Sequence, residues 1–207
     1  MKDIFEILES VGGYIKNSHI VGTSGKHLSE YLNKDALYPH TGMSSEVGKM
    51  IAGVVRDLEI DVVASPALGG IVLSQWTANH LSKMKGREVF GVYTEKNAEG
   101  DQELKRGYNK LIKGKKVLVV EDIINTGGSC KKAVESVRKE GAEVVGVAVM
   151  VNRNPDVVNE AYFGAPFFAL ASRKFPAYEE EDCPMCKAGV PINITVGHGK
   201  KYLAGKK

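Results

Sequence analysis

The stretch from residue 117 to residue 129 holds the side chains best suited to chemistry. It reads Val-Leu-Val-Val-Glu-Asp-Ile-Ile-Asn-Thr-Gly-Gly-Ser, an apolar run that ends in two carboxylates and a small polar turn. The run 117–120 predicts a strand buried on both faces. The glycines allow successive backbone N–H groups to point into one concavity. With Ser129 as the N-cap of a following helix, the turn suits a phosphate, whereas Glu121 and Asp122 suit the hydroxyls of a sugar diol.

Two further segments carry groups suited to an anionic ligand. Residues 65–70, Ser-Pro-Ala-Leu-Gly-Gly, place glycines between a predicted strand and a predicted helix, where backbone N–H groups could cradle an anion. Alternatively, Gly69 and Gly70 only allow close helix packing. Residues 93–115 form a long polar connection, typical of a lid or a disordered insertion, and a solvated linker is the alternative. The cations of this connection are Lys96, Lys105, Arg106 and Lys110.

Strands and helices are predicted to alternate along the chain. Strands are expected at 60–64, 89–93, 116–120 and 144–149. Helices are expected at 4–11, from the loop 65–70 to a point near Lys83, at 129–140 and behind the cap candidates Ser44 and Ser45. Residues 18–33 are interpreted as a hairpin or hood. This order predicts an α/β fold with a doubly wound, mostly parallel sheet, whose ligands bind at the carboxyl ends of the strands. We expect one domain over 1–207, with a hood and N-terminal helix in 1–40, a core in 44–172 and a tail segment in 173–207.

Composition limits the classes of partner. The chain has 207 residues, of which 43% are hydrophobic and 26% charged, and it can bury a sizeable core. A net charge of +3 is too small to indicate nucleic-acid binding, and no apolar stretch approaches the length of a membrane span. The N-terminus resembles no signal peptide, and three cysteines argue against a disulfide framework. We therefore expect a cytoplasmic protein with no nucleic-acid or membrane partner.

The acidic pair followed by Thr-Gly-Gly-Ser resembles the ribose-phosphate loop of the type I phosphoribosyltransferases. Ser-Gly-Lys at 24–26, the connection 93–115 and Cys-Pro-Met-Cys at 183–186 resemble orotate phosphoribosyltransferases, in their thermophilic and archaeal subset. The resemblance implies the family's fold with a small N-terminal hood. It also implies a Mg²⁺-dependent, cytoplasmic homodimer that transfers the phosphoribosyl group of phosphoribosyl pyrophosphate to orotate, giving orotidine 5'-monophosphate and pyrophosphate.

The resemblance also implies roles for individual residues. The ribose and 5-phosphate would be bound by Glu121, Asp122, Asn125, Thr126, Gly127, Gly128 and Ser129. The pyrophosphate would be bound by Ala67, Leu68, Gly69 and Gly70. The base would be bound by Lys26 and Arg153, and the catalytic residues would be Lys96, Arg106 and Asp122. The substrate would carry the Mg²⁺, so no residue is assigned as a metal ligand.

Two departures from the orotate pattern keep other functions open. Thr23 replaces a lysine found in many members, and Asn152 replaces the aspartate of an Asp-Arg pair. One alternative is a phosphoribosyltransferase for a purine or another nucleobase. Another is a regulator that senses phosphoribosyl pyrophosphate without catalysis. From the residues alone, Lys26 is also plausible as a surface charge and Arg153 as half of a surface salt bridge.

The cysteines form a separate feature. Cys183 and Cys186 make a lone Cys-x-x-Cys, whereas a zinc site needs four ligands, and His198 or a second subunit was the expected source of any others. We interpret the pair as structural, with metal binding as the alternative. Cys130, inside a predicted helix, is interpreted as an inert packed thiol.

Overall fold

The computed structural model describes residues 3–205, which divide into two compact units. One unit consists of residues 38–174. The other joins residues 3–37 to residues 175–205. The division shows that the predicted tail segment packs with the predicted hood. The single domain over 1–207 stays a prediction.

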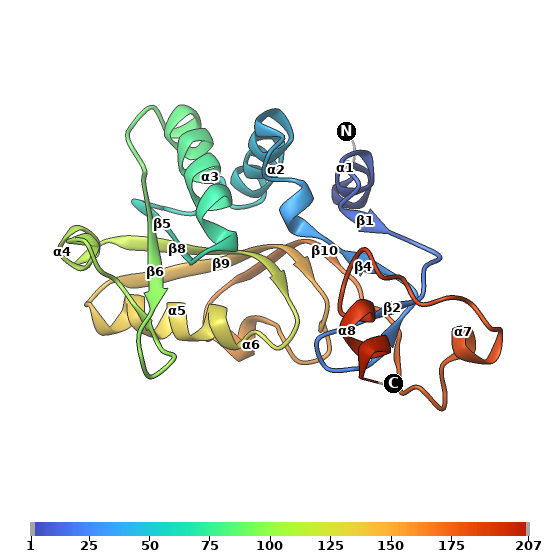
Figure 1. The fold of residues 1–207 in the computed structure, drawn as a ribbon. Coiled ribbons are helices and arrows are strands. Elements are labelled where there is room, and N and C mark those ends of the chain that lie inside the picture. The colour runs from blue at the N-terminus through green and yellow to red at the C-terminus, as the bar shows by residue number, and fades with distance from the viewer. Residues whose placement is uncertain (1–2, 206–207) are drawn as a thin grey trace. The chain divides into compact units, whose positions relative to one another are not determined.

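A six-stranded sheet forms the centre of the larger unit (Figure 1). Its strand order is β10-β9-β8-β5-β6-β7, and every neighbouring pair is parallel except β6 and β7. The strands are β5 (Val62–Pro66), β6 (Phe90–Lys96), β7 (Gln102–Glu103), β8 (Lys116–Ile124), β9 (Glu143–Asn152) and β10 (Phe167–Ser172). The helices are α2 (Thr41–Val54), α3 (Gly69–Lys85), α4 (Tyr108–Ile112), α5 (Gly128–Lys139) and α6 (Glu160–Phe163).

Helices cover both faces of this sheet. In Figure 1, α2 and α3 lie on one side, and α5 and α6 lie on the other. The predicted doubly wound, mostly parallel sheet is therefore confirmed. Within residues 3–205, no helix combines the length and the apolarity that crossing a bilayer requires.

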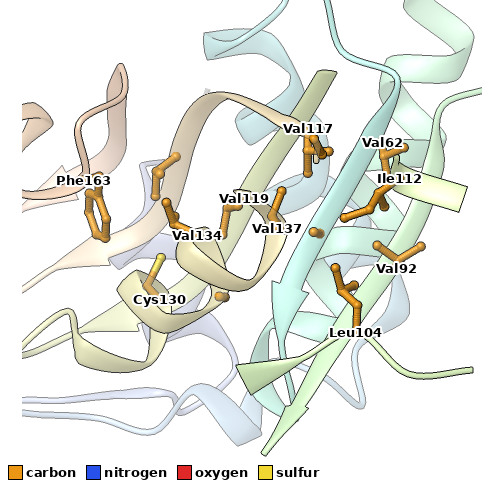
Figure 2. Packing of buried hydrophobic residues seen from close by; sticks show 14 of the residues in the cluster. Val62, Val92, Leu104, Ile112, Val117, Val119, Cys130, Val134, Val137 and Phe163 are labelled. Atoms are coloured by element: carbon orange, nitrogen blue, oxygen red, sulfur yellow. The ribbon is translucent and has the colours of Figure 1, made fainter. Parts of the chain in front are cut away.

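The packing of α5 fixes the position of the turn that precedes it. The side chains of Cys130, Val134 and Val137 are buried against Val117 and Val119 of β8, as Figure 2 shows. Full burial of a valine side chain stabilises a fold by roughly 1.5–3 kcal/mol. Burial raises the pKa of the Cys130 thiol well above its ordinary value, and the nearby charge of Glu121 adds to this effect. Both observations agree with an inert packed thiol.

Two predicted boundaries around the acidic pair are wrong. The strand was expected to end at Val120, but β8 continues to Ile124, because Glu121 pairs with Val149 of β9 and Ile124 pairs with Asn152. The helix was expected to be capped by Ser129. Instead α5 begins at Gly128 with Gly127 as its N-cap, so Ser129 lies in the first turn.

The predicted caps of the second helix are also wrong. The N-cap of α2 is His40, and the helix begins at Thr41, several residues before Ser44 and Ser45. Ser44 is fully buried, and its backbone N–H donates to the carbonyl oxygen of His40 at 2.9 Å. It is thus a small residue of the first turn.

The connection 93–115 contains regular secondary structure, namely the end of β6, the strand β7 and the helix α4. β6 and β7 form an antiparallel hairpin. The buried Thr94 hydroxyl donates to Oε1 of Gln102 at 2.7 Å, which closes the base of the hairpin. At its tip, Nζ of Lys132 in α5 lies 2.9 Å from Oδ1 of Asp101. The helix α4 follows.

The smaller unit is built from short elements. Its sheets are β11-β3-β2 and β1-β4, all antiparallel, so the hairpin predicted at 18–33 is confirmed. The strands are β1 (Tyr14–Ile15), β2 (Ile20–Val21), β3 (His27–Leu28), β4 (Tyr31–Leu32) and β11 (Ala177–Tyr178). The helices are α1 (Ile4–Ser10), the 3-10 helix η1 (Lys34–Ala36), α7 (Pro184–Lys187) and α8 (Gly199–Ala204).

Asp61, just before β5, is expected to make stability depend on pH. Its Oδ2 accepts from the backbone N–H of Lys116 at 3.0 Å, and Nη2 of Arg87 lies 3.2 Å from its Oδ1. The hydrogen bond from Lys116, followed by the charge of Arg87, lowers the pKa of Asp61. A lowered carboxyl pKa contributes stability above the unfolded value of about 4, and this stability is lost as the pH falls through the folded value.

The variant Asp61→Asn should therefore be less stable than the parent at neutral pH. The difference should shrink as the pH falls below about 4. Urea unfolding at a series of pH values measures it. A difference that stays constant across the series would contradict the assigned role of this carboxylate.

Candidate functional site

The carboxyl ends of the parallel strands bring the predicted loops to one edge of the sheet. The backbone N–H of Ala67, in the loop after β5, donates to the carbonyl oxygen of Thr94 in β6 at 2.8 Å. The backbone N–H of Arg153, directly after β9, donates to the carbonyl oxygen of Ile124 in β8 at 2.8 Å. The loop 65–70, the β6–β7 hairpin, the turn after β8 and Arg153 therefore lie along one edge.

The two carboxylates leave β8 on opposite faces. Residues alternate along a strand, so Glu121 shares the face of Val117 and Val119, where α5 packs, and Asp122 points to the opposite face. The residues are 8% and 4% exposed. Each carboxylate accepts a hydrogen bond from the backbone N–H of the residue that follows it. The acidic pair is therefore held rigidly at the strand end.

Tyr38, which precedes α2, is a site residue that the sequence analysis missed. Its hydroxyl donates to Oδ2 of Asp122 at 2.9 Å. The two residues are far apart in the sequence, and no local pattern links them. A hydrogen bond to a charged acceptor contributes about 1.5–3 kcal/mol. Tyr38 thus orients one oxygen of this carboxylate.

Replacing Tyr38 by phenylalanine should lower the free energy of unfolding by about 1.5 kcal/mol, because a buried carboxylate loses a donor. Urea denaturation measures the change. The loss should be smaller in an Asp122→Asn background, since the pair then lacks the charge that strengthens the bond. Equal losses in both backgrounds would show that the hydroxyl acts elsewhere.

The turn after β8 presents polar groups at the start of α5. Asn125, Thr126 and Ser129 are exposed. Gly127 has a φ of 79°, and a Cβ there would lie 2.8 Å from Cε1 of Tyr162. The first N–H groups of a helix have no intrahelical acceptor and carry partial positive charge, so this turn can hold an anion such as phosphate.

Tyr162 of α6 is a second residue that the sequence analysis missed. Its hydroxyl donates to the carbonyl oxygen of Thr126 at 3.1 Å, and Nζ of Lys131 lies 4.7 Å from the centre of its ring. The aromatic ring thus packs against the turn at Gly127, so closely that a residue with a Cβ does not fit at this position.

The loop 65–70 combines a packing role with exposed backbone. A Cβ on Gly70 would lie 2.7 Å from Cβ of Ser65 and 3.2 Å from the carbonyl oxygen of Val120. Close packing, the alternative raised for this glycine, is therefore real. Gly69 begins α3, and Leu68 is 83% exposed. These features leave the backbone of the loop open to a ligand.

The candidate catalytic cations lie at the ends of the β6–β7 segment. Lys96 is the last residue of β6 and is exposed. Nε of Arg106 lies 2.6 Å from Oε1 of Glu95, a hydrogen bond that lowers the pKa of Glu95 and raises that of Arg106. Arg106 would have to exchange this carboxylate for a ligand anion in order to act on one. Nζ of Lys105 lies 3.7 Å from Oε2 of Glu103, and Lys110 lies within α4.

Asn152 explains one of the departures noted in the sequence. It is 1% exposed, its Nδ2 donates to the carbonyl oxygen of Val158 at 2.9 Å, and its Oδ1 accepts from the backbone N–H of Asn154 at 3.0 Å. An amide satisfies both partners, whereas a carboxylate cannot donate. Asn152 therefore shapes the loop that follows Arg153, and Arg153 itself is half-buried.

Lys26, the other candidate for base binding, belongs to the smaller unit. Its Nζ lies 2.9 Å from Oε1 of Glu179, and both side chains are largely exposed. This contact matches the alternative of a surface charge. The role in base binding stays a prediction.

Comparison with known families gives a match over most of the chain. Residues 33–186 match the family model described as phosphoribosyl transferase domain. The orotate phosphoribosyltransferase of Thermotoga maritima is 36% identical over 199 residues, which cover 96% of this chain and 100% of the relative. That of Thermus thermophilus is 33% identical over 190 residues, which cover 92% of this chain and 98% of the relative.

Solved structures similar to this chain also include phosphoribosyltransferases. Mycobacterium tuberculosis orotate phosphoribosyltransferase, in complex with Fe(III) dicitrate, aligns with a TM-score of 0.67 and 25% identity over 83% of this chain and 96% of that chain. The same enzyme in complex with 5-phospho-alpha-D-ribosyl 1-diphosphate aligns with a TM-score of 0.63. An adenine phosphoribosyltransferase from Thermoanaerobacter pseudethanolicus, 16% identical with a TM-score of 0.54, shares the fold.

Proposed function

Because the chain belongs to the phosphoribosyltransferase family, we propose that it is an orotate phosphoribosyltransferase. The reaction transfers the 5-phosphoribosyl group of phosphoribosyl pyrophosphate to orotate and yields orotidine 5'-monophosphate and pyrophosphate. The observation that carries the proposal is the buried acidic pair at the carboxyl end of β8, directly before the phosphate-binding turn of α5. Relatives named orotate phosphoribosyltransferase are identical to this chain at about a third of the aligned residues, over nearly their whole length.

The geometry suits a displacement at the anomeric carbon of the ribose. A ring nitrogen of the base forms a bond to this carbon as the bond to pyrophosphate breaks, and the proton of that nitrogen is released to solvent. Positive charge grows on the ribose ring, where the fixed carboxylates of Glu121 and Asp122 would stabilise it, and negative charge grows on the pyrophosphate. The turn 125–129 would hold the 5-phosphate, and the loop 67–70 would hold the pyrophosphate. No covalent nucleophile is needed.

Mg²⁺ is part of the proposal as a cation that the substrate carries. Carboxylate oxygens such as those of Glu121 and Asp122 suit a hard cation. When bound, the ion would neutralise charge that develops on the leaving pyrophosphate. Arg153 would pair with the carboxylate of orotate through a bidentate contact, and Lys26 would contact the base. Cytoplasmic location and a homodimer belong to the same proposal.

Two cations of the 93–115 segment are expected to act on the leaving group. Alanine in place of Lys96 or Arg106 should lower kcat by about tenfold, which corresponds to one lost charge-assisted contact. Steady-state kinetics with saturating orotate measures the effect. Lys139→Ala, which removes an exposed cation from the last turn of α5, serves as the control and should leave kcat unchanged. Full activity of both test variants would remove these residues from the mechanism.

A panel of bases tests the function itself. Pyrophosphate release is measured with phosphoribosyl pyrophosphate, Mg²⁺ and either orotate, adenine, guanine, hypoxanthine or no base. Release with orotate alone supports the proposal. Release only with a purine would assign the chain to a purine enzyme on the same fold. Binding of phosphoribosyl pyrophosphate without release with any base would indicate a sensor.

A further inference from the structure

Four potential metal ligands from opposite ends of the sequence meet inside the smaller unit. They are His19, His27, Cys183 and Cys186, and one ligand atom from each lies within 4.8 Å of all the others. His19 is 2% exposed, and His27 and Cys183 are fully buried. The reaction proposed above uses none of these side chains.

The local folds explain how each pair forms. β2 and β3 are antiparallel, with Val21 opposite His27. His19 lies two residues before Val21 and so is the diagonal neighbour of His27 on the same face, within reach of its ring. Cys183 and Cys186 are three residues apart at the start of α7, which puts both sulfur atoms on one side of the helical turn.

The hydrogen bonds of the backbone then join the two pairs. The N–H of Asn193 donates to the carbonyl oxygen of His19 at 2.7 Å, and Ile192 forms a parallel bridge with His19. The strand β11 pairs with β3, placing Tyr178 opposite His27. These contacts tie the cysteine-bearing segment to the histidine hairpin on both sides of α7.

The separations fit a tetrahedral ion. Nε2 of His19 lies 3.7 Å from Sγ of Cys183 and 3.6 Å from Sγ of Cys186, and Nδ1 of His27 lies 3.3 Å from Sγ of Cys186. Zinc–nitrogen and zinc–sulfur bonds in a tetrahedron imply N···S separations of about 3.6 Å. The two nitrogen atoms are 2.8 Å apart, and a shared ion would need them about half an ångström further apart.

The protonation of His19 is the one a metal requires. Nδ1 of His19 lies 2.7 Å from the carbonyl oxygen of Val190. A carbonyl oxygen only accepts hydrogen bonds, so in the neutral imidazole Nδ1 carries the proton and Nε2 presents its lone pair to the cluster. Metal-binding histidines commonly donate their other ring nitrogen to a backbone carbonyl in this way.

We infer that His19, His27, Cys183 and Cys186 form a structural zinc site. Two thiolates, two neutral imidazoles and Zn²⁺ sum to zero charge, so the complete site can be buried without an unpaired ion. Two nitrogen and two sulfur ligands in a tetrahedron favour zinc, and four protein ligands leave no position for a substrate. The strands β2, β3 and β11 of this unit are two residues long, and a metal would cross-link the segments that carry them.

The cluster corrects the expected source of the remaining ligands. The sequence points to His198 as a possible zinc ligand, but in the structure its Nε2 lies 3.2 Å from Oγ1 of Thr23. The histidines of the cluster are His19 and His27. All four ligands therefore belong to one chain. His198 therefore provides a matched control.

Metal analysis of the full chain tests the inference. The protein, prepared without a polyhistidine tag or chelator, should contain one zinc ion per chain by mass spectrometry. The variants Cys186→Ser and His27→Gln should lower the zinc content at least about tenfold. The controls His198→Gln and Cys130→Ala should keep it.

Cobalt gives a readout that does not depend on the folding of a variant. Wild-type protein refolded with Co²⁺ should show thiolate-to-cobalt charge transfer and the intense visible bands of a tetrahedral site, and chelation should lower the Tm. Wild-type protein that takes up neither zinc nor cobalt, or a Cys183–Cys186 disulfide in its place, would overturn the inference. The activity with orotate is a separate measurement, so failure of one proposal leaves the other standing.

Discussion

A chain that carries both Glu121→Gln and Asp122→Asn is expected to lose at least about a hundredfold in kcat, the scale seen when preorganised electrostatic groups are removed from an active site. The amides keep the size of the side chains and remove two charges. The ribose ring would then develop positive charge without the field of the carboxylates. Pyrophosphate release with saturating substrates measures the loss.

The same double variant should keep its fold. Amide oxygens can still accept from the backbone N–H groups of Asp122 and Ile123, which the carboxylates now bind. Removing two adjacent buried charges relieves both desolvation and mutual repulsion, which offsets the weaker hydrogen bond from Tyr38, so the Tm should stay nearly level. Circular dichroism and thermal unfolding measure this, and loss of activity with retained stability is the signature of a site residue.

A control double variant separates this effect from a general change of charge. Glu135→Gln with Glu143→Gln removes two exposed carboxylates from α5 and β9 and should leave kcat unchanged. The single variants then divide the effect, because Glu121 and Asp122 lie on opposite faces of β8 and Asp122 is bonded to Tyr38. Near-normal turnover of the chain that carries Glu121→Gln and Asp122→Asn would refute the role proposed for the acidic pair.

The sheet could be predicted from the sequence because its signals are local. Short apolar runs that alternate with amphipathic segments predict parallel strands and crossover helices, and the structure confirms this order. The same local rule predicts that the central strand ends at Val120, because two carboxylates are unfavourable in a buried strand. Pairing of Glu121 with Val149 extends it, and that contact depends on the neighbouring strand.

The missed residues share one property, which is that their partners are distant in sequence. Tyr38 contacts Asp122, Tyr162 supports the turn at Thr126, and His19 meets the cysteines of α7. The Cys-x-x-Cys pair can be recognised in the sequence as a motif. The two histidines that join it, His19 and His27, lie in a hairpin, and the spacing between them matches no known metal-binding pattern. The strand pairing of β2 with β3 and of β3 with β11, together with the backbone contacts of His19 with residues 192 and 193, brings these ligands together.

The second large effect is expected from a single methyl group between α2 and α3. A Cβ on Gly48 would lie 2.5 Å from Cβ of Trp76, 2.9 Å from the carbonyl carbon of Trp76 and 3.0 Å from the backbone nitrogen of Thr77. Two of these atoms belong to the backbone of α3, so no side-chain rotation relieves the contact. Gly48→Ala should therefore lower the free energy of unfolding by about 2–3 kcal/mol.

Gly53 supplies the control within the same helix. It is exposed, and a Cβ there would meet nothing within 4 Å. Gly53→Ala should raise stability by about 0.5–1 kcal/mol, because alanine loses less backbone entropy in a helix. Urea unfolding of the two variants should give opposite signs for one chemical change, and equal or increased stability of Gly48→Ala would contradict the close packing of α2 on α3.

The Gly48 change should also reach the candidate site through α3. This helix begins with Gly69 and Gly70, in the loop proposed to bind pyrophosphate, and the close approach of Gly70 to Ser65 leaves the helix start no room to adjust. Displacement of α3 should thus raise KM for phosphoribosyl pyrophosphate in Gly48→Ala while KM is unchanged in Gly53→Ala. A destabilised Gly48→Ala with unchanged KM would show that α3 gives way at its far end, and that the loop is held by β5 alone.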